Sequence, residues 1–205
     1  MLGKRIRNKF IEFNKLLVKD VVVLGIPRGG VVIGKEVAEV LGCALDVIVV
    51  KKLGAPSQSE LAIGAVGETN GSKYVDERII QNLGVSIQYL GEEIERKKKE
   101  IKRREKLYRQ GKPPLDLKGK IVIVVDDGVA TGATIIAACR EVWNNEPKKV
   151  IIGLPVLAKD TLKKLEKEAD EVIFLEAPRM FFAVGQFYQK FLQVEDEKVI
   201  EILGK

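Results

Sequence analysis

The stretch that decides the fold is Ile121-Val122-Ile123-Val124-Val125-Asp126-Asp127-Gly128-Val129-Ala130-Thr131-Gly132-Ala133-Thr134. Its first five residues are branched and apolar, a pattern typical of a strand buried on both faces in a parallel sheet. Two carboxylates follow this strand, and a loop of small residues with two threonines leads into a helical pattern over residues 135–143. Because open α/β sheets bind ligands at the carboxyl ends of their strands, this loop is a candidate site.

The small-residue loop suits a phosphate group. Backbone N–H groups, threonine hydroxyls and the positive end of the following helix dipole all favour an anion there. The two neighbouring acids suit hydroxyl groups, so the segment predicts a sugar phosphate as ligand. The alternative is an ordinary Asp-Asp-Gly turn at the end of a buried strand. Such a turn does not require Thr-Gly-x-Thr at the helix start, so we favour the ligand site.

This segment resembles the signature of the type I phosphoribosyltransferases, which bind 5-phosphoribosyl-1-pyrophosphate (PRPP). That signature consists of four hydrophobic residues, two acids, a few small residues and Thr-Gly-x-Thr. The resemblance implies that Asp126 and Asp127 are catalytic residues that face the ribose hydroxyls and contact a metal ion indirectly. It also implies a 5-phosphate loop made of Ala130, Thr131, Gly132, Ala133 and Thr134.

A second loop, Gly25-Ile26-Pro27-Arg28-Gly29-Gly30, follows an apolar run at 21–25 and opens a helical pattern at 31–41. Glycines allow a close backbone approach to a ligand, and N–H groups at a helix start point toward an anion. In the type I family the corresponding loop binds pyrophosphate. The resemblance therefore implies pyrophosphate binding by Arg28, Gly29 and Gly30, against the alternative of a plain turn.

Two lysines end the predicted second strand, residues 45–50. A solvated surface pair is the simple interpretation of Lys51 and Lys52. Family members carry a basic residue beside the pyrophosphate at this strand end, and we assign that catalytic and pyrophosphate-binding role to Lys52. The small polar segment 53–60 lies where the family carries a mobile loop that closes over the site.

The order of apolar patterns predicts the fold. Runs that begin near residues 21, 45, 121, 150 and 171 alternate with helical patterns, which indicates an α/β doubly wound parallel sheet. Asn70-Gly71 between two strand-like runs predicts a β-hairpin, Asp76 is a candidate cap for a short helix, and Ser86 is a candidate start for a long one. We expect a single phosphoribosyltransferase domain over 1–205, with an insertion at about 53–115 and a C-terminal hood at about 176–205.

Two predicted helices are amphipathic. The first covers residues 5–19, and the second carries nine Lys/Arg and five Glu over residues 92–109. An apolar stripe runs along this long helix, formed by Ile87, Leu90, Ile94, Ile101 and Tyr108. The stripe and the interleaved acids favour a helix with one solvated face over a nucleic-acid surface, so we do not expect a nucleic-acid partner.

The composition excludes several classes of protein. The chain has 205 residues, a formal net charge of +6 and no histidine, which removes His-based triads and most zinc sites. Cys43 and Cys139 fit no metal spacing and are expected to be buried thiols. No apolar run reaches the roughly 18 residues of a membrane span, and the N-terminus lacks a secretion signal pattern. We therefore expect a cytoplasmic protein.

The resemblance implies a transferase of nucleotide metabolism, a glycosyltransferase (pentosyltransferase) that displaces pyrophosphate from PRPP with a nitrogenous acceptor. Magnesium is the implied cofactor and a homodimer the implied assembly. A purine-like base is one candidate acceptor, although enzymes acting on 6-oxopurines usually carry Asp where this chain has Ala130. The aromatic segment 177–188 is a candidate for base stacking or for simple packing.

Two alternatives remain open. The first is a non-catalytic PRPP-sensing regulatory protein that binds RNA or a protein partner. The second is a hydrolase or phosphorylase-like activity on the same scaffold.

Overall fold

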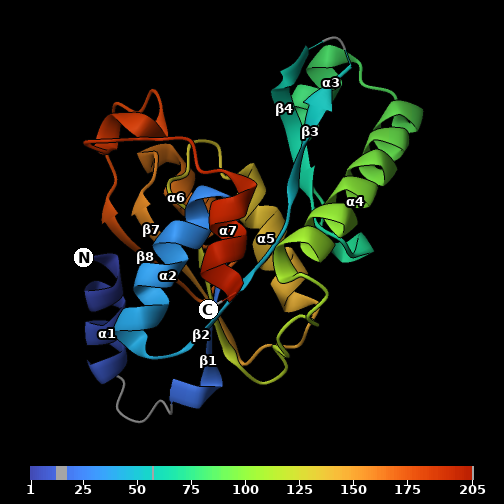
Figure 1. Ribbon diagram of the computed structural model, residues 1–205. Helices are drawn as coiled ribbons and strands as arrows, with labels where there is room; N and C mark the ends of the chain where they lie inside the picture. Colours follow the sequence, from blue (N-terminus) through green and yellow to red (C-terminus); the bar gives the residue numbers. More distant parts are fainter. Residues whose placement is uncertain (13–17, 57, 205) are drawn as a thin grey trace.

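The computed structural model of the chain describes residues 1–12, 18–56 and 58–204. Its main sheet has five parallel strands in the order β2-β1-β6-β7-β8 (Figure 1). The predicted α/β parallel sheet is therefore confirmed. The strands are β1 (Val21–Gly25), β2 (Ala44–Val47), β6 (Ile121–Val125), β7 (Lys149–Val156) and β8 (Glu171–Glu176).

Helices cover both faces of this sheet, as doubly wound folds require. Alternate residues of β6 face opposite sides: Ile121, Ile123 and Val125 pack in one core, and Val122 and Val124 in the other. The first core includes α1 (Leu2–Glu12) and α2 (Gly29–Leu41), and the second includes α5 (Ala133–Trp143) and the short α6 (Leu162–Leu165). The C-terminal helix α7 (Asp196–Gly204) lies against α2 and α4.

Residues 51–109 form a separate projection, which we call the arm (Figure 1). It contains an antiparallel sheet in the order β3-β4-β5, followed by two helices. Asp76 and Ser86 cap the two helices by accepting hydrogen bonds from the N–H groups of Ile79 and Tyr89, as predicted. The elements are β3 (Lys51–Ala55), β4 (Gln58–Val66), β5 (Tyr74–Val75), α3 (Glu77–Leu83) and α4 (Ile87–Arg109).

The prediction for the second strand was partly wrong. β2 ends at Val47 instead of residue 50, and Lys51 and Lys52 begin β3 instead of ending β2. Residues 48–50 are buried without belonging to a strand, so their apolar character reflects burial alone. The segment 53–60 is also different from the expected loop, because its described residues belong mostly to β3 and β4, which pair as a hairpin.

Two other predictions need correction, and a third is only partly tested. The Asn70-Gly71 segment forms a short 3-10 helix (Asn70–Ser72) in a longer connection, although β4 and β5 do pair antiparallel around it. Ile87 is 91% exposed as the first residue of α4 and lies outside the apolar stripe predicted to include it, whereas Leu90 and Ile94 are half-buried against the core that contains Ile101 and Tyr108. The N-terminal helix is described over Leu2–Glu12, and residues 13–17 of its predicted range lie outside the described residues.

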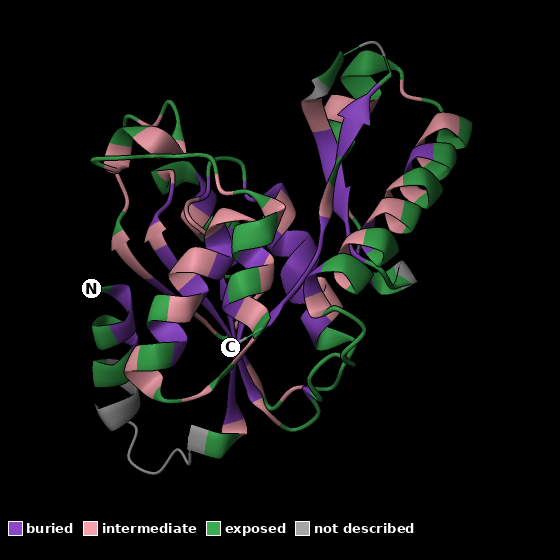
Figure 2. Ribbon diagram, in the orientation of Figure 1, coloured by how far each residue is buried: buried purple, intermediate pink, exposed green. Residues whose placement is uncertain are grey.

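The arm is tied back to the sheet at the end of α4. The Arg109 Nε donates to both carboxylate oxygens of Asp46, at 3.0 and 3.2 Å, and its Nη2 donates to the Val47 carbonyl. Figure 2 shows that burial continues from the sheet into β3 and β4, whereas the outer face of α4 is exposed. In the described part of the chain, no helix combines the length and apolarity needed to cross a membrane.

Candidate ligand-binding site

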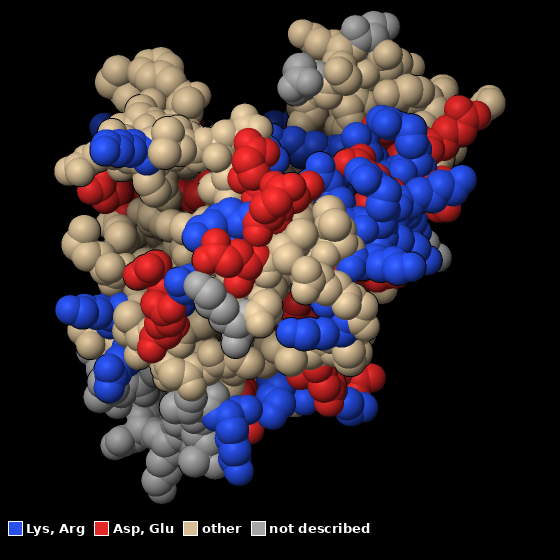
Figure 3. All heavy atoms as spheres, in the orientation of Figure 1, with Lys and Arg blue, Asp and Glu red and all other residues tan. Residues whose placement is uncertain are grey.

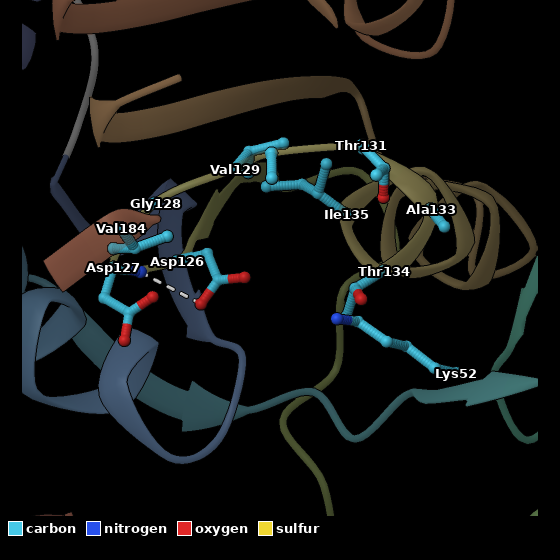
Figure 4. A pocket seen from close by; sticks show the side chains of 12 residues that line it. Lys52, Asp126, Asp127, Gly128, Val129, Thr131, Ala133, Thr134, Ile135 and Val184 are labelled. Carbon is cyan, nitrogen blue, oxygen red and sulfur yellow. Dashed lines mark hydrogen bonds between the residues drawn. The ribbon is translucent and has the colours of Figure 1, made fainter. Parts of the chain in front are cut away.

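The candidate site lies at the carboxyl end of β6, near the middle of the sheet. Asp126 and Asp127 follow the buried strand directly, and the loop then continues to the first residue of α5, Ala133. Gly132 precedes the helix with a φ of 86°, a left-handed conformation that glycine adopts without strain. The loop and helix start line a cavity of about 260 Å³ together with Lys52 and Val184 (Figure 4).

The first loop packs against the acidic pair so closely that only glycine fits. A Cβ atom at Gly29 would lie 1.9 Å from Oδ2 of Asp127, and one at Gly30 would lie 2.6 Å from the Val125 carbonyl oxygen. The Ile26 N–H also donates to the Val125 carbonyl at 2.9 Å. The two loops singled out from the sequence therefore form one continuous surface, and the Pro27–Arg28 peptide within it is cis.

The two carboxylates are electrostatically costly in the absence of a ligand. Burial raises the pKa of Asp126 well above its usual range, and the neighbouring charge of Asp127 raises this pKa further. Burial also raises the pKa of Asp127. The N–H of Asp127 donates to Oδ1 of Asp126 at 2.9 Å (Figure 4), and Lys52 offsets part of the charge on Asp126. Such a pair gains from hydroxyl donors or a cation.

Lys51 and Lys52 are the first two residues of β3, and their side chains point in opposite directions. Successive side chains of a strand point to opposite faces, so one lysine faces α4 and the other faces the site. Lys51 forms an ion pair with Glu100 of α4 at 2.6 Å. Lys52 lines the cavity and its amino group points toward Thr134 (Figure 4). The arm therefore contributes one cation directly to the candidate site.

Arg28 lies differently from the other predicted site residues. Its Nη1 is 3.2 Å from Oε2 of Glu195 and 4.0 Å from Oδ1 of Asp196, at the start of α7. Among the described residues that line the cavity, Arg28 is absent. The structure thus brings together Asp126, Asp127, Lys52 and the loop 130–134, with Gly29 and Gly30 packed behind the acids, and turns Arg28 toward α7.

The C-terminal hood contributes contacts that the sequence did not predict. Val184 lines the cavity and packs on Gly128, where a Cβ atom would lie 2.6 Å from the valine Cγ1. The Tyr188 hydroxyl of the hood donates to the Asp127 carbonyl. Outside the hood, the Thr161 hydroxyl donates to the Ala130 carbonyl. The aromatic content of 177–188 was the available signal for the hood, but it did not indicate which residue reaches the acids.

The two carboxylates limit the number of ligands that the protein can provide to a metal ion at this site. In the described part of the chain, no cluster of three or more His, Cys, Asp or Glu side chains has the arrangement of a metal site. Two adjacent carboxylates fit Mg²⁺ only if ligand oxygens and water complete its coordination, which is the usual preference of this ion. The donor set therefore suits a magnesium ion carried in with a phosphorylated ligand.

The fold and the site define an α/β protein with a cavity at the carboxyl end of the central strand β6, and comparisons with known proteins show its family. A family model described as phosphoribosyl transferase domain matches residues 4–191. The chain therefore belongs to the phosphoribosyltransferase family.

Relatives of known sequence or structure agree with this family. The chain is 42% identical over 187 residues to the Mycobacterium tuberculosis protein named "Putative phosphoribosyl transferase Rv0571c". That match spans 91% of this chain and 42% of the relative, so the chain covers less than half of the relative's length. The crystal structure of TT1426 from Thermus thermophilus is similar with a TM-score of 0.78 and 38% identity, over 98% of this chain and 94% of that one.

Proposed function

We propose that this protein is a phosphoribosyltransferase that displaces pyrophosphate from PRPP with a nitrogenous acceptor. The observation that carries the proposal is the meeting of an acidic pair and a threonine-bearing helix start in one cavity, within a chain of this family. A purine-like base is a suitable class of acceptor to test first, and the location of the reaction would be the cytoplasm.

The 5-phosphate would occupy the loop 130–134. The helix dipole of α5 and the loop N–H groups favour an anion at this position, and the hydroxyls of Thr131 and Thr134 can donate to it. Both threonines line the cavity. The Thr161 hydroxyl donates a hydrogen bond to the Ala130 carbonyl, and this bond stabilises the loop without using a group that the phosphate needs.

The ribose would lie over Asp126 and Asp127, which can accept hydrogen bonds from its two hydroxyls. Because burial disfavours both charges, hydroxyl donors would stabilise the ionised carboxylates more strongly here than at an exposed site. Gly29 packs directly against the Asp127 carboxylate and limits the space on that side of it. Precise placement of this kind accounts for much of catalysis when no covalent intermediate is formed.

The pyrophosphate would lie between the first loop and the arm. Lys52 points into the cavity from β3, and Gly29 and Gly30 present their backbone beside the acids. Magnesium, when bound, would neutralise the leaving pyrophosphate, and Asp126 and Asp127 would contact the ion through water. Lys52 can stabilise the same developing negative charge.

The test is a screen for pyrophosphate release from PRPP in the presence of magnesium and single nitrogenous bases. Release that requires one base supports the transferase and names its acceptor. Release without any base indicates the hydrolytic alternative. PRPP binding without release, across all bases, favours the sensor alternative, for which the exposed cations of α4 (Figure 3) are a candidate contact surface.

A further inference from the structure

The side chain of Arg28 is engaged by acids instead of facing the cavity. Arg28 is the residue before α2, and its neighbour Gly29 packs directly on Asp127. Its guanidinium is 3.2 Å from Glu195 and 4.0 Å from Asp196, and the Arg28 side chain is 31% exposed. A cation predicted to bind an anionic ligand is thus paired with an internal anion.

The acids that engage Arg28 also connect to the arm. Asp196 accepts hydrogen bonds from the Tyr108 hydroxyl at 2.7 Å and from Arg104 at 3.5 Å. Arg104 in turn lies 3.5 Å from Glu100, which pairs with Lys51 at 2.6 Å. Alternating charges therefore run from Arg28 through α7 and α4 to β3, the strand that carries Lys52.

This network is not fully satisfied. The Nε of Arg104 is buried and makes no hydrogen bond to a described residue, although a carboxylate lies nearby. An unsatisfied buried donor costs free energy, so the network is stabilised less than a fully hydrogen-bonded one would be. The Arg28–Glu195 pair is also exposed, with Glu195 60% exposed, and exposed pairs are weak enough to be exchanged for another anion.

We propose that Glu195 is a positioning residue that stands in for a pyrophosphate group. Its carboxylate binds the Arg28 guanidinium beside α7 until the pyrophosphate group of a ligand displaces it. This inference rests on the proposed function, because it concerns the pyrophosphate part of the same site. An arginine fork matches carboxylate and phosphate oxygens alike, so the two anions compete for it. A ligand that must displace an internal competitor binds more weakly than it would to the free cation.

The test is calorimetric titration of inorganic pyrophosphate with magnesium, and separately of ribose 5-phosphate, into the wild type, Glu195→Gln and Glu197→Gln. Glu197 is the matched control: it lies in the same helix start, is exposed, and makes no ion pair among the described residues. We expect Glu195→Gln to bind pyrophosphate about two- to five-fold more tightly, with ribose 5-phosphate unchanged. Glu197→Gln should match the wild type with both ligands.

A second pair of variants separates direct competition from a general change of charge. In an Arg28→Gln background, Glu195→Gln should have no effect on pyrophosphate affinity, because the competed cation is gone. An equal gain with Glu197→Gln, or a gain that persists without Arg28, would overturn the inference.

The experiments distinguish failure of the proposed function from failure of the proposed role of Glu195. A wild type that binds no PRPP contradicts the proposed function and this inference with it. A wild type that binds PRPP, together with a Glu195→Gln variant whose pyrophosphate affinity is unchanged, contradicts the inference alone.

Discussion

The parallel sheet and the arm are held together by different interactions. The central strands β1, β6 and β7 are buried among branched apolar side chains on both faces, with Ile123 and Val124 fully inaccessible. The arm packs on the rest of the molecule through a further apolar cluster, in which Ile63 and Ile101 of the arm meet Val199 of α7, and charged or polar contacts such as Asp46–Arg109 and Tyr108–Asp196 add to this packing. The acids and the loop 130–134 therefore follow a strand that is buried on both faces of the main sheet, whereas Lys52 lies on a strand of the arm's own small sheet.

The largest expected effect is in the sheet. Ile123→Ala should lower the free energy of unfolding by about 4 kcal/mol, because it opens a cavity in a core that is packed on all sides. Chemical denaturation measures this change. Ile87→Ala is the matched control, since Ile87 is 91% exposed, and should change stability by less than about 0.5 kcal/mol. Equal losses at both positions would contradict the described burial.

Breaking the attachment of the arm should cost less and act locally. Asp46→Asn should lower stability by about 3 kcal/mol, because Arg109 loses the nearer of its two carboxylate partners in a largely buried setting and keeps only Glu105 at 3.5 Å. Hydrogen exchange should then show faster exchange of α4 amides than of β6 amides. Asp116→Asn, at an exposed position with only a local hydrogen bond, is the control. Uniform exchange across both elements would show that the arm and the sheet open together.

The arm also contains a group that titrates near neutral pH. Burial raises the pKa of Glu105 to about 7, with neighbouring Glu68 and Glu141 adding to the effect and Arg109 opposing it. The folded state therefore keeps a proton that the unfolded state releases at lower pH, so this group's contribution to stability falls as pH rises from about 4.5 to about 7. Glu105→Gln should be more stable than the wild type by roughly 1–2 kcal/mol at pH 8.

Measurement of unfolding at pH 4.5 and pH 8 checks this prediction. The advantage of the Glu105→Gln variant should shrink toward pH 4.5, where the wild-type carboxyl is protonated in the folded state. An advantage that does not change with pH would contradict the raised pKa.

The smallest effect compares two tyrosines that make the same kind of bond. Tyr188 donates to the Asp127 carbonyl beside the site, and Tyr89 donates to the Gly54 carbonyl within the arm at 2.9 Å. Replacement of either by Phe should lower stability by about 1 kcal/mol. Only Tyr188→Phe should also weaken PRPP binding, because it loosens the hood over the acidic loop. Calorimetry on both variants measures the difference, and equal affinities would contradict a role for the hood contact.

The sequence predicted the sheet well because each strand can be recognised from its own consecutive residues. Five consecutive branched residues at 121–125 leave few alternatives to a buried parallel strand, and β1 and β6 occur at the predicted residues. The same signal failed at residues 48–50, where an apolar run is buried but the chain is leaving the sheet. Periodicity cannot separate burial from strand pairing in so short a segment.

The candidate site was predicted only in part, for a related reason. The motif 126–134 could be named because it follows the end of a strand and matches a family pattern. Lys52 could be named from the family pattern alone, because it begins β3 instead of ending the predicted strand. The pairing of Arg28 with Glu195 and the contact of Tyr188 with Asp127 join residues 167 and 61 positions apart. No local pattern encodes such contacts, which depend on how the hood and α7 fold back over the sheet.

The most direct test of the central claim is calorimetric titration of PRPP with magnesium into the wild type and into an Asp126→Asn/Asp127→Asn variant. We expect binding to the wild type and at least about 100-fold weaker binding to the variant, since two charged hydrogen-bond acceptors are lost. The variant should unfold at an equal or higher temperature, because burial raises the pKa of both carboxyls and their charges oppose folding at neutral pH. Unchanged PRPP affinity in a folded variant would contradict the assignment of this pocket.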